Sequence, residues 1–231
     1  MKIAVTGDLK NTVIDKLPNG FELNYSNPEI VISFGGDGTL LSSEDKHPGI
    51  PKLFVKHKWS CTTCNNHNFK SMFKLLSSKN YKILEYSKLD LFVNGKKELT
   101  AMNDISLHYI PPRAVRFSLK INSKLISKEI IGDGFVVSTN FGSSGYFHSI
   151  TRKNFSQGYG VTLNNPVQKM KPVINKNLTI EANISRGPAI IVADCLDKKI
   201  ELNEKDTILI KPSKAKTRII KIGSDLRYKS Y

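Results

Sequence analysis

A glycine-rich loop around one carboxylate, Gly35-Gly36-Asp37-Gly38-Thr39, is the strongest chemical signal in the sequence. It follows an apolar run at 29–34 and precedes Leu40-Leu41. Glycines let a backbone approach a ligand closely and adopt positive φ, and their N–H groups can cradle phosphate oxygens at the start of a helix. Asp37 would repel an anion if it only bound it, so we expect it to act as a general base or through Mg²⁺. The alternative is a tight strand–turn–helix junction in which Asp37 is the N-cap.

A second polar group follows Gly132-Asp133-Gly134, where an apolar run at 135–139 leads into Asn140-Phe141-Gly142-Ser143-Ser144-Gly145-Tyr146. Hydroxyl and backbone N–H groups in such a segment can bind ribose or phosphate, and Tyr146 can pack on a base. The alternative is a polar loop without a ligand.

A third group, Asn103-Asp104, interrupts a β-type run at 101–107. Buried polar side chains need hydrogen-bond partners, and an adenine edge or ribose hydroxyls could supply them. The alternative is a β-bulge or bend.

A cysteine–histidine cluster lies at His57, Cys61, Cys64 and His67. Its spacing could form a tetrahedral Zn²⁺ site, although structural zinc sites usually draw ligand pairs from two separated stretches. A Cys61–Cys64 disulfide and plain thiols are the alternatives. The chain has three cysteines, and this odd count argues against a secreted disulfide scaffold.

The elements that must position these groups change in type along the chain. Short apolar strands at 3–6, 29–34 and 52–55, with an amphipathic helix at 67–78, predict a parallel α/β layer in residues 1–80. From 81 to 231 β-type runs dominate, with an Asn94-Gly95 hairpin between 81–93 and 98–109. Further runs lie at 115–121, 125–130, 134–139, 178–184, 189–193, 207–211 and 218–222.

These patterns predict a two-domain fold, an α/β N-terminal domain (1–80) and a β-rich C-terminal domain (81–231). The last residues can pack back on the first domain. Ligand sites favour such domain junctions.

The composition fits a globular protein with a polyanionic ligand. The net charge is +15, which suits nucleotides, nucleic acid or an anionic membrane, or is a solvated basic surface. The lysines form no polybasic tail, and there is no nucleic-acid-binding signature. No apolar stretch approaches the roughly 20 residues that span a bilayer. We therefore expect a cytoplasmic protein with small-molecule partners and no nucleic acid or membrane partner. We also expect a homo-oligomer, because β-rich domains expose edges.

The three motifs together resemble the NAD kinase family. That family has a GGDGT loop, an Asn-Glu or Asn-Asp pair in a β segment, and an Asp-Gly strand leading to a Thr-Pro-Thr-Gly-Ser-Thr-Ala-Tyr stretch. All three occur here in that order. The resemblance extends from about residue 30 to residue 222, including 190–195 and 202–210. GGDGT alone is shared with diacylglycerol and sphingosine kinases, whereas the combination is specific to NAD kinases.

The resemblance implies an NAD kinase-like architecture and phosphorylation of the 2′-hydroxyl of the adenosine ribose of NAD, with ATP as donor and Mg²⁺ bound through the nucleotide. It makes Asp37 the base. The residues that it implies in binding phosphate and NAD are Gly35, Gly36, Gly38, Thr39, Asn103, Asp104, Asp133, Ser144, Gly145, Tyr146 and Ser149, and it implies no metal ligand among the side chains.

The sequence departs from the family at several positions. The family's Pro-Thr is Asn140-Phe141, its Thr-Ala is Ser144-Gly145, and Ile131 stands where many members carry arginine. The family's Asn-x-Gly-x-x-Gly-Phe loop is replaced by residues 56–64, which contain no glycine. A catalytically silent NAD-binding protein and a lipid or sphingoid kinase therefore remain the alternatives.

Overall fold

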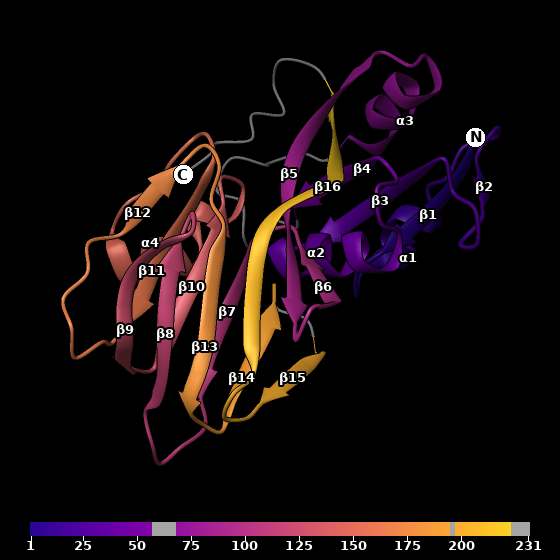
Figure 1. The fold of residues 1–231 in the computed structure, drawn as a ribbon. Coiled ribbons are helices and arrows are strands. Elements are labelled where there is room, and N and C mark those ends of the chain that lie inside the picture. Colours follow the sequence, from indigo (N-terminus) through magenta and orange to yellow (C-terminus); the bar gives the residue numbers. More distant parts are fainter. Residues whose placement is uncertain (57–67, 195–196, 223–231) are drawn as a thin grey trace. The chain divides into compact units, whose positions relative to one another are not determined.

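The computed structural model describes residues 1–56, 68–194 and 197–222, which form two compact units. The first unit holds Met1–Tyr86 and the strand residues 216–222, and the second holds Ser87–Ala215 (Figure 1). Residues His57, Cys61, Cys64 and His67 lie outside the described residues, so the zinc prediction stays a prediction.

The first unit is a parallel sheet with helices, as the alternation of strand and helix predicts. Its strands lie in the order β2-β1-β3-β4-β16, and β1 with β2, β1 with β3, β3 with β4 and β4 with β16 are parallel. The strands are β1 (Lys2–Thr6), β2 (Glu22–Leu23), β3 (Ile30–Gly35), β4 (Lys52–Lys56) and the end of β16 (Thr207–Ile222). The helices are α1 (Lys10–Ile14), α2 (Asp37–Lys46) and α3 (Phe69–Ser77).

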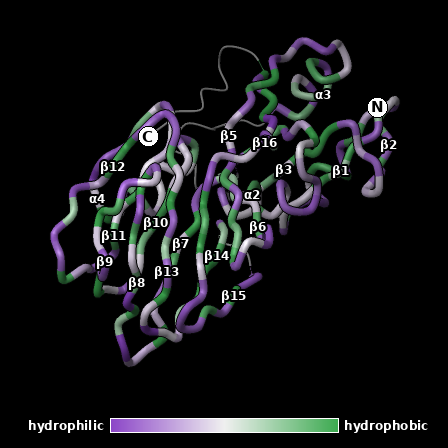
Figure 2. Tube along the Cα trace, viewed as in Figure 1, coloured by the Kyte–Doolittle hydropathy of each residue, from purple (hydrophilic) through white to green (hydrophobic). Residues whose placement is uncertain are grey.

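Apolar residues of β1, β3 and α3 form the core of this unit. Five of the six residues of β3 are buried, and Figure 2 shows hydrophobic residues following one another along that strand. Helix α3 buries Phe69, Met72, Phe73 and Leu76, which recur at helical spacing. Its N-cap is Asn68, whose side chain accepts a 3.1 Å hydrogen bond from the Ser71 N–H.

A buried ion pair ties the C-terminal end of α2 to the start of β4. Lys52 is fully buried, and its Nζ lies 2.5 Å from the Glu44 carboxylate. The same Nζ donates to the carbonyls of His47 (2.6 Å) and Ile50 (2.8 Å), and Glu44 accepts the Gly49 N–H at 3.1 Å. These contacts fix the direction of α2, whose first residue is Asp37.

The second unit consists of antiparallel strands in two sheets, which confirms the β-rich prediction. One sheet contains β9, β8, β13 and β16, with β5 paired to β16 and β6. The other has the order β12-β11-β10-β7-β14-β15. The bounds of the first set are β5 (Tyr81–Val93), β6 (Lys96–Ala101), β8 (Val115–Ile121), β9 (Lys124–Gly132) and β13 (Ile180–Arg186). The second set is β7 (Asp104–Tyr109), β10 (Gly134–Thr139), β11 (Tyr159–Asn164), β12 (Val173–Asn175), β14 (Ala189–Ala193) and β15 (Lys199–Leu202), with the 3-10 turn Gly142–Ser144 and helix α4 (Tyr146–Thr151) between β10 and β11.

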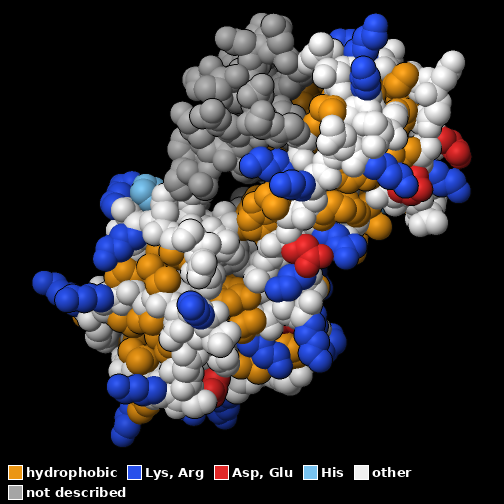
Figure 3. Space-filling model, turned by 90° about the horizontal axis from the view of Figure 1, so that it is seen from above, with side chains coloured by type: hydrophobic (Ala, Val, Ile, Leu, Met, Phe, Trp, Pro, Cys, Tyr) orange, Lys and Arg blue, Asp and Glu red, His pale blue; other side chains and the backbone are white. Residues whose placement is uncertain are grey.

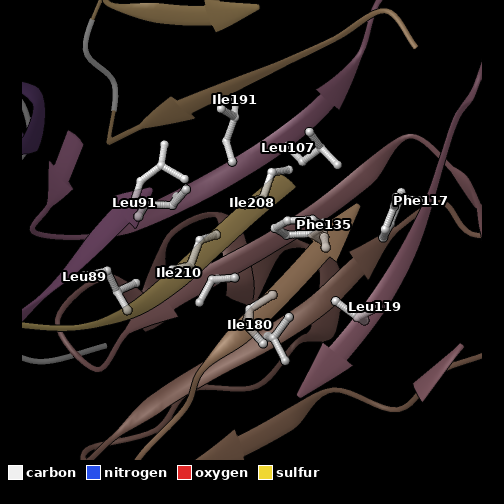
Figure 4. Packing of buried hydrophobic residues seen from close by; sticks show 14 of the residues in the cluster. Leu89, Leu91, Leu107, Phe117, Leu119, Phe135, Ile180, Ile191, Ile208 and Ile210 are labelled. Carbon is white, nitrogen blue, oxygen red and sulfur yellow. The ribbon is translucent and has the colours of Figure 1, made fainter. Parts of the chain in front are cut away.

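Alternate side chains of the two sheets form one hydrophobic core (Figure 4). Phe117 of β8 meets Phe135 of β10 edge-to-face, with ring centroids 5.4 Å apart. On β7 the core residues are Ile105 and Leu107. Successive strand residues point to opposite faces, so Asp104, Ser106 and His108 stand on the other face of the six-stranded sheet.

Two predicted strands differ from the structure. The run predicted at 98–109 is broken into β6 and β7 at Met102-Asn103, where the backbone N–H groups bond a side chain instead of a strand. The runs predicted separately at 207–211 and 218–222 belong to one strand, β16. Pro212 lies beyond the residues of β16 that pair with β13, so its missing N–H breaks no bond of that ladder.

On the face seen in Figure 3, basic side chains are spread out rather than gathered in one patch. Among the described residues, no helix is long and apolar enough to cross a membrane.

We predict that Lys52→Met lowers the free energy of unfolding by about 3–5 kcal/mol, because it removes the buried ammonium group that lies against the buried Glu44 carboxylate. Urea denaturation measures this. The matched control is Lys120→Met, which removes the exposed Lys120–Glu181 pair (3.7 Å) and should cost below about 1 kcal/mol. Equal effects of the two substitutions would contradict a structural role for the buried pair.

Candidate functional site

The glycine loop lies at the carboxyl end of β3, in the first unit. Strand β3 ends at Gly35, Gly36 is the N-cap in an extended conformation, and α2 begins at Asp37. The tight strand–turn–helix junction is therefore present, but its N-cap is Gly36 and not Asp37 as the alternative predicted. The first N–H groups of a helix lack intrahelical acceptors, which makes this end of α2 suited to phosphate oxygens.

The sequence predicts positive φ angles in the glycine loop, and this prediction is wrong. None of Gly35, Gly36 and Gly38 has a positive φ. A Cβ at Gly35 would lie 2.3 Å from the Thr39 hydroxyl, so this glycine is needed for packing. Around Gly36 and Gly38 a Cβ would meet no atom of the described residues within 4 Å. Packing among the described residues therefore does not require glycine at these two positions, whereas the close approach of a ligand would.

A neighbouring glycine, Gly7, joins the loop after β1 to the glycine loop. It has φ +113, and a Cβ there would lie 2.0 Å from the carbonyl oxygen of Phe34. Sequence reasoning missed it, although Thr6-Gly7-Asp8 directly follows an apolar strand. Hydroxyls support the two loops, since Ser43 Oγ lies 2.6 Å from Thr6 Oγ1 and donates to Ser33 Oγ at 3.0 Å.

Asp37 faces a lysine across the ends of two neighbouring strands. Its side chain is 75% exposed, and Lys56 Nζ lies 3.4 Å from its Oδ1. Lys56 ends β4 and is paired in register with Gly35. A carboxylate and an ammonium group beside an open glycine backbone can accept a proton and neutralise phosphate charge, respectively.

The second cluster lies in the second unit, where the Asn103-Asp104 bend meets the Gly/Ser segment. The Asn103 carbonyl accepts the Thr139 N–H at 2.8 Å, and Thr139 Oγ1 donates to the Met102 carbonyl at 2.7 Å. A Cβ at Gly142 would lie 2.4 Å from the Asn103 carbonyl oxygen, so only glycine fits there. Two motifs that are separate in sequence are thus packed on each other.

Asp194 closes this bend from the end of β14. Its carboxylate accepts the N–H groups of Met102 (2.9 Å), Asn103 (2.6 Å) and Asp104 (3.2 Å). From the sequence, the run 190–195 is part of the family resemblance, but no role is predicted for this residue. An aspartate directly after a buried strand is the signal that could have identified it.

Tyr146 is held over the polar face of the six-stranded sheet. Its ring stacks on His108 with centroids 5.9 Å apart and planes 6° apart, and its hydroxyl accepts a 2.9 Å bond from Asn164 Nδ2. His108 and Asn164 are the two residues paired in register with Gly134, so Tyr146 contacts the residues on both sides of that glycine. His108 Nε2 also lies 2.9 Å from the Ser106 hydroxyl.

The two predicted carboxylates lie near this tyrosine. Burial, and then the charges of Asp104 and Asp133, raise the pKa of the Tyr146 phenol. Asp133 also accepts a 3.1 Å hydrogen bond from Asn165 Nδ2. Asn103 Oδ1 is buried and has no hydrogen-bond partner among the described residues, which leaves it available to a ligand donor.

The remaining predicted residues lie at the surface of the same segment. Ser144 and Gly145 are exposed at the start of α4, and Ser149 Oγ donates to the Tyr146 carbonyl at 2.8 Å. Ser143 is instead buried and bonds the Asn140 and Phe155 carbonyls, so its role is structural. Asn103, Asp104, Asp133 and Tyr146 therefore gather in the second unit, and Asp37 with its glycines gathers in the first.

Burial and then the charge of Asp194 raise the pKa of Asp104 to about 7. The described residues offer the Asp104 carboxylate no hydrogen-bond donor, whereas Asp194 has three backbone donors. Burial raises the pKa of Asp194 as well, whereas these three N–H groups and the charge of Lys88 lower it. Because Asp104 has no such donors among the described residues, we expect it to be the carboxyl group of the pair that holds a proton near neutral pH. No group of three or more metal-ligating side chains occurs among the described residues.

Comparisons with known proteins identify similar chains. No family model matches. An NAD kinase of Saccharolobus islandicus (strain M.14.25 / Kamchatka #1) is 30% identical over 146 residues, which cover 61% of this chain and 57% of the relative. An NAD kinase of Sulfurisphaera tokodaii is 31% identical over 153 residues, 64% of this chain and 60% of the relative. The match thus spans little more than half the length of these relatives.

Two solved structures share the fold. One is an NAD kinase from Archaeoglobus fulgidus in complex with ATP, with a TM-score of 0.74 and 21% identity over 98% of this chain and 96% of that chain. The other is yeast NADH kinase complexed with NADH, with a TM-score of 0.77 and 17% identity over 97% of this chain and 75% of that chain.

The chain therefore has the two-domain fold of these kinases, an α/β layer and a β-rich unit. The chain is thus similar in sequence to NAD kinases over little more than half of their length, and the three motifs predicted this similarity.

We predict that Asp104 makes stability depend on pH. Its pKa is about 7 in the folded chain against an ordinary 3.8, so the stability that it contributes is full below the ordinary value and is lost as pH rises through about 7. Asp104→Asn removes the titrating group. The free energy of unfolding of the variant, relative to that of wild type, should therefore be higher at pH 8 than at pH 4. Urea denaturation of both proteins across this range measures it, and parallel pH curves would contradict the raised pKa.

Proposed function

We propose that the chain is an NAD kinase that transfers the γ-phosphoryl group of Mg-ATP to the 2′-hydroxyl of the adenosine ribose of NAD, giving NADP. The observation that carries the proposal is Asp37, an exposed carboxylate in a loop where Gly36 and Gly38 are open to a ligand. The similarity to NAD kinases supports the same reaction class.

The first unit would supply the chemistry. Asp37 would take the proton of the attacking hydroxyl, and the backbone of Gly35, Gly36, Gly38 and Thr39 would line the phosphate path. Lys56, 3.4 Å from Asp37, would neutralise phosphate charge. Phosphoryl transfer asks for positioning and electrostatic stabilisation rather than covalent help, and these residue types provide both.

The second unit would hold NAD. Asn103 Oδ1 is buried and unpartnered among the described residues, so it would accept a hydrogen bond from the dinucleotide. Protonated Asp104 would donate one, and Tyr146 offers an aromatic face fixed by His108 and Asn164. The other contributors would be Asp133, Ser144, Gly145 and Ser149.

Mg²⁺ fits the first unit as a nucleotide-bound ion. Hard cations prefer carboxylate and phosphate oxygens, and the exposed Asp37 carboxylate is the one such group in the glycine loop. When bound, the ion would neutralise charge on the phosphates.

The proposal includes assembly and location. We propose a cytoplasmic homo-oligomer with NAD and ATP as its small-molecule partners. Strands β9 and β12 end their sheets and expose Leu125, Ile126 and Ile174, which a second copy could cover.

We predict that Asp37→Asn lowers kcat by about 10²–10⁴-fold, the usual contribution of a general base, and leaves NAD affinity and the melting temperature nearly unchanged. Its ion pair is exposed and adds little stability. NADP formation from NAD and Mg-ATP, read with an NADP-specific dehydrogenase, measures both rate and phosphate position. The matched control is Asp45→Asn, another exposed acid of α2.

Other outcomes select the alternatives. Full activity of Asp37→Asn would remove it from the base role. A folded wild type that binds NAD but yields no NADP would favour the silent binder, and phosphorylation of diacylglycerol or sphingosine instead of NAD would favour the lipid kinase.

A further inference from the structure

We propose that Asp194 is a positioning residue for NAD, because its carboxylate holds the Asn103-Asp104 bend in the conformation that presents both side chains to the dinucleotide. This inference rests on the proposed function for its substrate and on the contacts of the bend for its geometry.

The carboxylate of Asp194 fills an anion-binding turn of backbone N–H groups. Its Oδ1 accepts the N–H groups of Asn103 (2.6 Å) and Asp104 (3.2 Å), and its Oδ2 accepts that of Met102 (2.9 Å). Successive backbone N–H groups that converge on one point form a nest for an anion. Here the anion is a side chain from a segment about 90 residues later in the chain.

The bend depends on this anion for its hydrogen bonds. Strand β6 ends at Ala101 and β7 begins at Asp104, so Met102 and Asn103 are not in a strand ladder. Hydrogen bonds to a charged acceptor are stronger than neutral ones, and an N–H left without an acceptor is costly when buried. Met102 is fully buried, and the carboxylate satisfies its N–H.

The contact between Asp194 and the bend runs in both directions. The Asp194 N–H donates to the Asp104 carbonyl at 2.8 Å, and Asp194 has φ +53, a left-handed conformation that aspartate adopts more readily than most residues. The backbone and the side chain of Asp194 therefore both bond the same bend. Any change at this position acts on the backbone that carries Asn103 and Asp104.

The side chains on this bend are those left for a ligand. Asn103 Oδ1 is buried without a partner among the described residues, although the Asn103 carbonyl is bonded to Thr139. The backbone N–H and carbonyl groups of the bend are thus hydrogen-bonded, whereas the side-chain oxygen of Asn103 has no partner among the described residues. That division is expected for a preorganised binding residue.

The negative charge of Asp194 adds a second effect that is separate from geometry. It is the second cause, after burial, of the raised pKa of Asp104. Among the described residues, Tyr146 of α4 interacts with Asp104, and Lys88 of β5 interacts with Asp194. Removing the charge at 194 should lower the pKa of Asp104, so the pH dependence of NAD binding should move to lower pH.

The test compares Asp194→Ala and Asp194→Asn with wild type in NADP formation. We expect Asp194→Ala to raise KM for NAD by about 10–100-fold, the usual cost of misplacing a binding group, with KM for ATP and kcat nearly unchanged. Asp194→Asn keeps one acceptor oxygen, so its KM for NAD should lie between those of wild type and Asp194→Ala. The pH profile of its KM for NAD should move to lower pH. Hydrogen exchange of the Met102, Asn103 and Asp104 amides should quicken in both variants.

The matched control is Asp206→Ala. Asp206 also closes a turn of the second unit, accepting the Asn203 N–H (2.7 Å) and Asn94 Nδ2 (2.8 Å). Its loss should lower the melting temperature but leave KM for NAD unchanged, which separates positioning from general destabilisation.

The outcomes are distinct. Unchanged KM for NAD and unchanged amide exchange in folded Asp194→Ala would overturn the inference, as would a loss confined to kcat. If wild type binds NAD but yields no NADP, the proposed function fails. NAD titration and amide exchange of the same variants then decide the role of Asp194.

Discussion

The six-stranded sheet of the second unit can serve a ligand because its strands present alternate residues to two different environments. One set, including Ile105, Leu107 and Phe135, belongs to the hydrophobic core. The pleat then forces Asp104, Ser106 and His108 onto the opposite face. A shift of one residue in register would exchange the two sets and bury the polar one, so core packing fixes which side chains are available for chemistry.

In the first unit, the direction of the strands decides which residues come together. Parallel strands end at one edge of their sheet, which brings the loops after β1 and β3 and the end of β4 to one place. Gly7 allows the first loop to touch the second, and Lys56 lies beside Asp37. The buried Lys52–Glu44 pair holds α2 at its C-terminal end, away from the glycine loop at which the helix begins. The stabilising ion pair and the proposed base are therefore different residues of the same helix.

Two carboxylates in the second unit divide their roles by hydrogen bonding. Burial raises the pKa of both groups, that of Asp104 to about 7, but three backbone donors stabilise the charged form of Asp194 alone. One group suits a fixed anion and the other a protonated donor near neutral pH. The basic side chains that contribute to the net charge of +15 are instead spread out on the face seen in Figure 3.

The sequence by itself determined the fold class and the segments of the candidate sites. Apolar periodicity marked β3, α3 and β10 because their core residues recur at the spacing of the element, and the glycine-rich motif marked Asp37. Only the tertiary structure decided how distant segments meet. Asp194 binds residues about 90 positions earlier, Gly7 contacts Phe34, and the strand expected at 98–109 breaks at Met102-Asn103. The physical reason is that these contacts join segments far apart along the chain, and a local residue pattern can mark one partner but does not specify which distant segment it meets.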